Sequence, residues 1–143
     1  MHLDHVVLWV EDPLRSVDFY ERIVGLRGVR VDEFREGKAP FPSVRISEHA
    51  VLDLMSTKMA PVLNGIAKGT PAAESAGHPV HHVCVAMTEA EYTALKARLD
   101  AAGVSTAFTM ENSFGAQGHA PRAFYFADPD GNVLEARHYQ RSQ

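Results

Sequence analysis

The feature that most constrains this chain is an internal repeat of a strand, a helix and three further strands. Two opening segments superpose, Leu3-Asp4-His5-Val6-Val7 on Val80-His81-His82-Val83-Cys84. Two closing segments also superpose, Ala50-Val51-Leu52-Asp53-Leu54 on Asn132-Val133-Leu134-Glu135-Ala136. Each half therefore places a histidine third in its first strand and a carboxylate fourth in its last. One supersecondary unit used twice cannot cover its sheet alone, so two units, in one chain or in two chains, must close the structure.

Apolar periodicity, capping residues and turn signals locate the elements. The predicted elements are a strand at 3–10, a helix from 13 to Gly25, strands near 28–34, 43–46 and 49–55, a strand at 79–87, a helix opened by a capping box at Thr88 and ended by Gly103, a strand at 104–108, a loop at 111–121, and a hairpin of 123–127 with 132–139. We predict one α+β domain of two βαβββ modules, residues 1–58 and 79–143, joined by a linker at 59–78. The modules should form a curled, mixed but mostly antiparallel sheet around a cleft, with the helices outside.

Composition excludes several classes of function. The net charge of −4 over 143 residues is negative, and it therefore does not favour binding to nucleic acid or to an anionic membrane. Cys84 is the single cysteine, which excludes an intramolecular disulfide. The first residues show no basic segment followed by a long apolar run, so a cytoplasmic location is expected.

The repeated positions carry the candidate chemistry. In a strand alternate side chains share a face, so His5 lies with Val7 and Trp9, and His82 lies with Cys84. If the sheet curls, the two histidines and Glu135 point into one concavity and offer a facial ligand set with open positions. Each residue alone has an ordinary alternative: a histidine hydrogen-bonded in the core, or a solvated edge carboxylate. Their placement at repeat-related positions favours one metal site, and burial of an unpaired Glu135 would be costly.

Three segments resemble the glyoxalase, bleomycin-resistance and extradiol dioxygenase superfamily, also called vicinal oxygen chelate proteins. They are the two opening segments above and Phe124-Tyr125-Phe126-Ala127-Asp128-Pro129-Asp130-Gly131-Asn132-Val133-Leu134-Glu135. The resemblance implies that His5, His82 and Glu135 bind one divalent ion, Fe, Mn, Zn or Ni. It also implies a small substrate whose two adjacent oxygens meet the ion, which acts as a Lewis acid. Members of this superfamily commonly close their sites with a partner chain, so we expect a homodimer with shared sites.

The resemblance leaves the subfamily open. Glyoxalase I has a fourth ligand, a glutamate, where Asp53 stands here, and fosfomycin-modifying enzymes have a threonine at the position of Val7. Extradiol dioxygenases place a tyrosine ten residues before the glutamate, as Tyr125 stands to Glu135, but their acid–base histidine would fall near Val44 or Arg45. Lyase or isomerase chemistry of the glyoxalase type and ring-cleaving dioxygenation both remain. The contrasting alternative is a non-catalytic drug-binding protein of the bleomycin-resistance type, which typically lacks the ligands.

Further residues are candidates for contact with substrate. His119 and Arg122 can orient an anionic substrate or move a proton, although a solvated loop explains them equally well. Tyr125 and Asp53 are candidate catalytic groups, and a core aromatic is an equal interpretation of Tyr125. Trp9 and Val7, on the face of His5, are predicted to form a pocket wall that contacts substrate. Cys84 is interpreted as a small buried apolar residue rather than a nucleophile.

Overall fold

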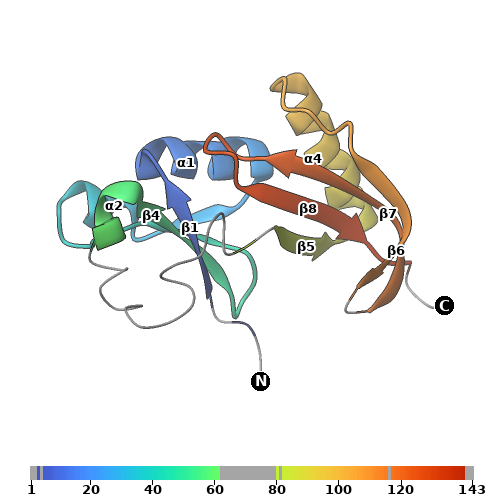
Figure 1. Ribbon diagram of the computed structural model, residues 1–143, viewed down its shortest axis with the longest axis horizontal. Helices are drawn as coiled ribbons and strands as arrows, with labels where there is room; N and C mark the ends of the chain where they lie inside the picture. Colours follow the sequence, from blue (N-terminus) through green and yellow to red (C-terminus); the bar gives the residue numbers. More distant parts are fainter. Residues whose placement is uncertain (1–2, 4, 62–79, 81, 116, 141–143) are drawn as a thin grey trace. The chain divides into compact units, whose positions relative to one another are not determined.

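The computed structural model describes residues 3, 5–61, 80, 82–115 and 117–140 (Figure 1). The chain divides into two compact units, one of Met1–Glu21 with Leu26–His81 and the other of Arg22–Gly25 with His82–Gln143. Most of the predicted linker lies outside the described residues, so its boundaries stay a prediction. No helix in the described ranges is long and apolar enough to cross a membrane.

The first unit follows the predicted βαβββ order with one added short helix. Its elements are β1 (His5–Val10), α1 (Pro13–Phe19), β2 (Arg27–Val29), α2 (Val31–Arg35), β3 (Ser43–Arg45), β4 (Val51–Ser56) and a 3-10 turn (Thr57–Met59). A π-helical turn (Tyr20–Val24) follows α1, and its residues from Arg22 onward are grouped with the other unit. The sheet order is β1-β4-β3-β2. β1 and β4 are parallel, and the remaining pairs are antiparallel.

The second unit repeats this topology. It contains β5 (Val83–Met87), α4 (Glu89–Ala101), β6 (Thr109–Gly115), β7 (Gly118–Ala127) and β8 (Val133–His138). Its sheet order, β5-β8-β7-β6, has one parallel pair, β5 with β8, and antiparallel pairs elsewhere. Two mixed, mostly antiparallel sheets with the same strand order confirm the predicted α+β fold of two modules.

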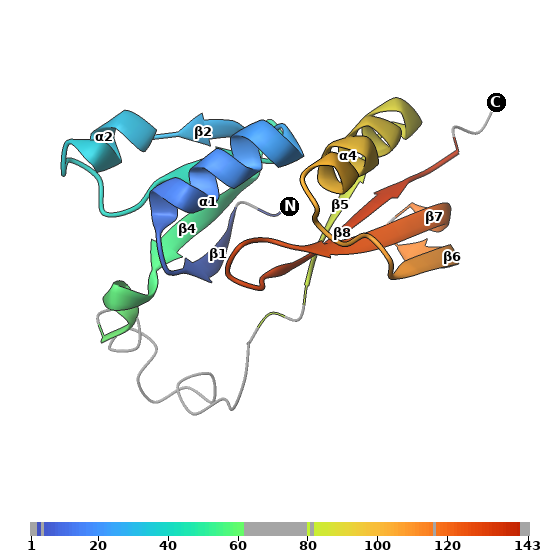
Figure 2. The ribbon, with the colours of Figure 1, turned by 90° about the horizontal axis from the view of Figure 1, so that it is seen from above.

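One face of each sheet packs against a helix. In the first unit β1 and β4 bury alternate aliphatic residues, including Leu8 and Leu54, and α1 runs along this sheet (Figure 2). In the second unit Tyr92 of α4 places its ring 4.8 Å from the rings of both Phe124 and His138. Because strand residues alternate, the opposite face of each sheet carries the repeat-related polar groups.

Two local predictions were wrong. No strand occupies residues 104–108, and the strand begins at Thr109. Of residues 111–121, expected as a loop, 111–115 lie in β6 and 118–121 lie in β7. Asn112 lies inside β6 with a φ of 52°, in the left-handed region. Asparagine is typical of such positions in loops, which is why this stretch resembles a loop in sequence. The strand predicted near residues 28–34 ends at Val29, and α2 follows.

Candidate functional site

Glu135 lies in the middle of β8, which is the second strand of its sheet. Cys84 of β5 and Tyr125 of β7 are its direct neighbours across the sheet. Residues opposite each other in a sheet share a face, so these three side chains belong to the face that α4 does not cover. The Asp128–Gly131 turn fixes this register, since the Asp128 Oδ1 atom accepts the Asn132 backbone N–H at 2.9 Å.

The Glu135 carboxylate is 2% exposed and has a different partner on each oxygen. His82, just before β5, places Nε2 3.2 Å from Glu135 Oε2. Arg137 donates from Nε to Glu135 Oε1 at 3.0 Å, and its Nη2 forms a closer ion pair with the same oxygen. Burial of this carboxylate is therefore compensated by a guanidinium, and one oxygen remains directed at the imidazole.

Arg137 is itself buried and held by several acceptors. Its Nη2 donates to Ser113 Oγ at 3.1 Å, and its Nη1 reaches Ser113 O and Tyr139 Oη, each at 3.4 Å. Desolvation alone would lower the pKa of the Arg137 guanidinium, but hydrogen bonds to Tyr139 and Glu135 outweigh it and raise the pKa. The guanidinium therefore stays charged beside Glu135.

An aromatic group borders the same carboxylate. The Tyr125 ring lies edge-on to the His82 ring at 5.5 Å and to the Phe108 ring at 5.2 Å. Its hydroxyl donates to Met110 Sδ at 3.6 Å. Desolvation, with Glu135 as the next cause, raises the pKa of Tyr125, so its hydroxyl is protonated at neutral pH. Phe108 is 65% exposed and gives this border an apolar surface.

Cys84 is exposed, so its predicted burial was wrong. Partial desolvation of the thiol, reinforced by the negative charge of Glu135, raises the pKa of Cys84 to about 11. A thiol with that pKa is protonated at neutral pH, which agrees with its interpretation as a residue that is not a nucleophile.

The first unit has its own buried carboxylate at the repeat-related position. Asp53 of β4 lies opposite Val7 of β1 and Ser43 of β3. The Ser43 hydroxyl donates to Asp53 Oδ1 at 2.6 Å. The first residue of β1, His5, is exposed, and Trp9 is half-buried at the other end of the strand. Asp53 points away from the face packed on α1, as strand alternation predicted.

The remaining predicted residues, His119 and Arg122, are exposed side chains of β7. Arg122 lies three positions before Tyr125, so the two side chains are on opposite faces of β7. In the sheet Arg122 lies opposite His138, the histidine that packs against Tyr92. Its charge acts on the Tyr92 hydroxyl, on the face covered by α4. His119 lies opposite Phe114, near the tip of the β6–β7 hairpin. The structure does not bring either residue to Glu135, and their roles stay predictions.

The donors in the second unit fit a divalent metal. Ligand bonds of about 2.1 Å put two donors on one ion roughly 3.0–3.4 Å apart, and His82 Nε2 and Glu135 Oε2 fall within that range at 3.2 Å. His5, the third predicted ligand, belongs to the first unit. Among the described residues, no three histidine, cysteine, aspartate or glutamate side chains form a group able to hold a metal.

Arg137 and the groups around it are not among the site residues predicted from the sequence. Arg137 follows Glu135 by two residues on one strand, so alternation alone placed both on one face. Its partners Ser113 and Tyr139 gave no such signal, because Ser113 lies in the stretch expected to be a loop. The shared face of Glu135 and Arg137 thus follows from their spacing, while the contacts of Arg137 with Ser113 and Tyr139 do not.

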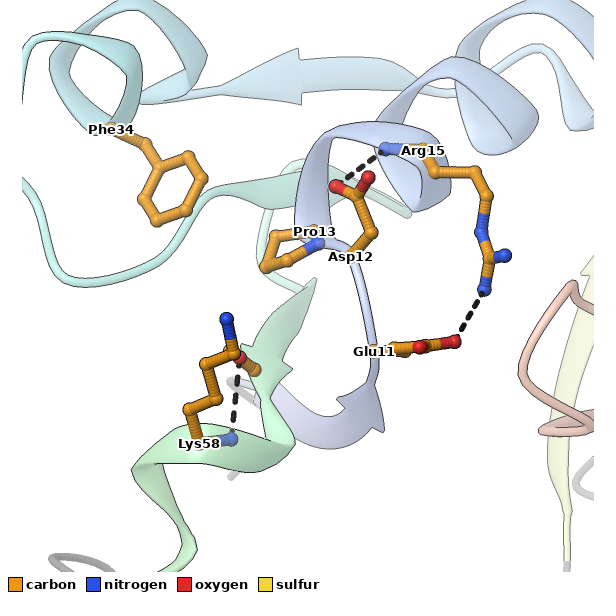
Figure 3. Close-up of a pocket in the computed structure, with 7 residues that line it drawn as sticks. Glu11, Asp12, Pro13, Arg15, Phe34 and Lys58 are labelled. Carbon is orange, nitrogen blue, oxygen red and sulfur yellow. Dashed lines mark hydrogen bonds and ion pairs between the residues drawn. The ribbon is translucent and has the colours of Figure 1, made fainter.

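A separate pocket of about 570 Å³ opens in the first unit beside the start of α1 (Figure 3). Its lining mixes both signs of charge, and the Arg15 guanidinium lies 3.7 Å from a Glu11 carboxylate oxygen. The lining residues are Glu11, Asp12, Pro13, Arg15, Phe34, Ser56 and Lys58. None of the predicted site residues lines it, so we place the candidate site at Glu135 and not in this pocket.

Comparison with known proteins identifies the family. The model of the Glyoxalase/Bleomycin resistance protein/Dioxygenase superfamily matches residues 2–136. A lactoylglutathione lyase of Pseudomonas aeruginosa is 49% identical over 35 residues, which are 24% of this chain and only 20% of that protein. The chain therefore spans about a fifth of this curated relative.

Solved structures share the fold over almost the whole chain. An integron cassette protein from the mobile metagenome of Vibrio cholerae is 26% identical, with a TM-score of 0.70 and coverage of 98% of this chain and 96% of that one. A lactoylglutathione lyase from Agrobacterium tumefaciens is 19% identical, with a TM-score of 0.62 and coverage of 94% and 90%. With a family match over nearly its full length, the chain belongs to the glyoxalase, bleomycin resistance protein and dioxygenase superfamily.

Proposed function

We propose that the protein is a divalent-metal-dependent enzyme with His5, His82 and Glu135 as metal ligands. The observation that carries this proposal is the 3.2 Å approach of His82 Nε2 to Glu135 Oε2 within a buried carboxylate site. A buried carboxylate next to an imidazole is the donor chemistry that Zn, Mn and Fe accept. We include His5 as a ligand because its position in the first module is the one that His82 occupies in the second.

The substrate we propose is a small molecule with two adjacent oxygen atoms. A bound divalent ion would supply Lewis-acid activation of those oxygens. Tyr125 places its ring edge-on to the His82 ring, and Phe108 provides an apolar surface for the rest of the substrate. Glyoxalase-type lyase or isomerase chemistry and ring-cleaving dioxygenation both use such a site, and the two differ in the metal and in the groups that move protons.

Metal analysis of anaerobically purified protein, followed by two assays, tests this proposal. Oxygen uptake with catechols identifies a dioxygenase, and thioester formation from hemithioacetals identifies glyoxalase chemistry. We expect one of the two activities, and we expect it to fall to background in His82→Ala. Absence of both activities in protein that holds its metal would contradict the proposed reaction classes.

Asp53 is proposed to be an auxiliary carboxylate rather than a ligand. Its Oδ1 atom accepts the Ser43 hydroxyl, and its side chain is one methylene shorter than that of a glutamate. Asp53→Asn should therefore keep near-normal metal content while turnover falls. Loss of metal from this variant would make Asp53 a ligand and favour glyoxalase chemistry.

The assembly we propose is a homodimer in which one chain supplies His5 and the other supplies His82 and Glu135. Mixing inactive His5→Ala and Glu135→Ala proteins should then restore activity, because subunit exchange leaves one intact site in each heterodimer. No recovery after verified exchange, or a monomer in sedimentation, would contradict shared sites.

A metal-free binding protein of the bleomycin-resistance type is the second candidate. The observation in its favour is the Arg137–Glu135 ion pair, which neutralises the buried carboxylate without a metal. Purified protein that lacks metal, shows neither activity and binds bleomycin in a calorimetric titration would establish this function instead.

A further inference from the structure

The strongest unexplained feature of the site is the way Glu135 is held. Arg137 donates two N–H groups, from Nε and Nη2, to a single carboxylate oxygen of Glu135, Oε1. A carboxylate offers about four lone-pair positions on two oxygens. Here the guanidinium occupies one oxygen and leaves Oε2 directed at His82.

The guanidinium has a fixed position of its own. Ser113 accepts from Arg137 with both its hydroxyl and its backbone carbonyl, which anchors the side chain to β6. Tyr139 Oη contacts Arg137 Nη1 and also accepts the backbone N–H of Gln117, in the turn between β6 and β7, at 3.4 Å. Arg137 is 5% exposed, so water has little access to its contacts with Ser113 and Glu135.

From this geometry we infer that Arg137 is a positioning residue that locks the Glu135 carboxylate and restricts metal ligation to Oε2. The inference rests on the proposed metal-dependent function. Ligation through one oxygen leaves more of the ion's coordination positions for a substrate that binds with two oxygens. Arg137 thereby acts through Glu135, without contact with the substrate.

In the first unit the repeat-related carboxylate has no arginine two positions after it. The residue repeat-related to Arg137 is Met55, which lies two positions after Asp53 in β4 and is also buried. Asp53 has a hydroxyl partner, Ser43, at the place where Glu135 has Tyr125. The contact of a guanidinium with the buried carboxylate therefore occurs in the unit that contains the His82–Glu135 pair.

The test measures the affinity of the folded protein for Co²⁺ by competition with a chelator. Arg137→Met should weaken Co²⁺ binding by about ten- to a hundredfold, as loss of a group that orients a metal ligand usually does. Arg137→Lys keeps the charge but cannot make the two-pronged contact, so its affinity should fall between those of wild type and Arg137→Met. Ser113→Ala removes only one anchor of the guanidinium and should give the smallest loss.

The matched control is Arg35→Met. Arg35 also pairs with a carboxylate, at 2.9 Å from Asp32, but that pair is exposed and lies in α2 of the first unit. This variant should bind Co²⁺ as wild type does. Thermal unfolding with a chelator present distinguishes a role in positioning Glu135 from a role in stability alone. If Arg137 only stabilised the fold, its substitution would lower the unfolding temperature and leave the Co²⁺ affinity of the folded protein unchanged.

Equal or tighter Co²⁺ binding by Arg137→Met, with binding abolished in Glu135→Ala, would overturn the inference and leave the proposed function intact. Wild-type protein that binds no Co²⁺ would remove the proposed function and the inference with it. If Arg137→Met does not fold, Arg137→Lys and Ser113→Ala decide: wild-type affinity in both overturns the inference, and graded losses support it.

Discussion

The two units place a carboxylate at the same position and surround it differently. Asp53 and Glu135 each lie in the strand between a parallel and an antiparallel neighbour, and both are buried. Asp53 accepts one hydroxyl, from Ser43, whereas Glu135 has a guanidinium on one oxygen and the His82 imidazole near the other. The duplicated backbone fixes where a carboxylate stands, and its neighbours determine what that carboxylate can do.

The difference follows from the cost of burying charge. A single neutral hydroxyl compensates part of that cost, so Asp53 is suited to a supporting role. Arg137 compensates much more, because its charge stays fixed beside Glu135. We therefore expect substitutions in the second unit to have larger effects than the equivalent substitutions in the first.

The largest expected loss of stability comes from Glu135→Ala. This change leaves the Arg137 guanidinium buried without its carboxylate, so the free energy of unfolding should fall by about 3–5 kcal/mol in metal-free protein. Urea denaturation with a chelator present measures it. A loss below about 1 kcal/mol would show that Arg137 is satisfied by its other acceptors alone.

A smaller loss is expected from Ser43→Ala in the first unit. The Ser43 hydroxyl donates to a buried carboxylate, and hydrogen bonds to charged groups contribute about 1.5–3 kcal/mol. Urea denaturation should show a loss in that range, against little change for Ser47→Ala, an exposed serine of the same unit. A loss equal to that of Glu135→Ala would remove the asymmetry between the units.

The smallest effects are expected at the helix caps, where the units again differ. Asp12 accepts the backbone N–H groups of Leu14 and Arg15 at the start of α1, whereas Thr88 and Glu91 form a reciprocal capping box at the start of α4. Replacing either cap, Asp12 or Thr88, by alanine should cost about 1 kcal/mol. Thermal unfolding of both variants measures these costs.

The capping box adds a pH dependence to the cost of Thr88→Ala. Hydrogen bonds from the Thr88 backbone and side chain lower the pKa of Glu91 below its ordinary value of 4.5. A lowered folded-state pKa gives stability that is present above pH 4.5 and lost as the pH falls through the lowered value. The difference between wild type and Thr88→Ala should therefore shrink below pH 4.5, and a difference that grew on acidification would contradict the capping box.

The repeat and the turn signals predicted the architecture, because both depend on local patterns. Alternation placed Glu135 and Asp53 on the faces away from the helices, and the Asp128–Gly131 turn set the β7–β8 register. The β6–β7 hairpin was missed because Asn112, two glycines and Pro121 are typical of loops. Its register also brings Ser113 to Arg137, so a contact between distant segments escaped an analysis of local pattern.

Alternation also separates candidates that the sequence grouped together. Arg122 and Tyr125 were both candidates for contact with substrate, yet they are three residues apart and therefore on opposite faces of β7. The structure accordingly places the Arg122 charge near Tyr92 of α4.

Metal stoichiometry tests the central claim, that the His82–Glu135 pair of the second unit binds the metal and that Asp53 of the first unit is not a ligand. Wild type, Asp53→Asn and His82→Ala are dialysed against the same Zn²⁺ buffer and analysed for bound metal per chain. We expect one ion per chain in wild type, nearly the same in Asp53→Asn, and loss of most of the metal from His82→Ala. Equal metal in wild type and His82→Ala, or loss from Asp53→Asn alone, would contradict it.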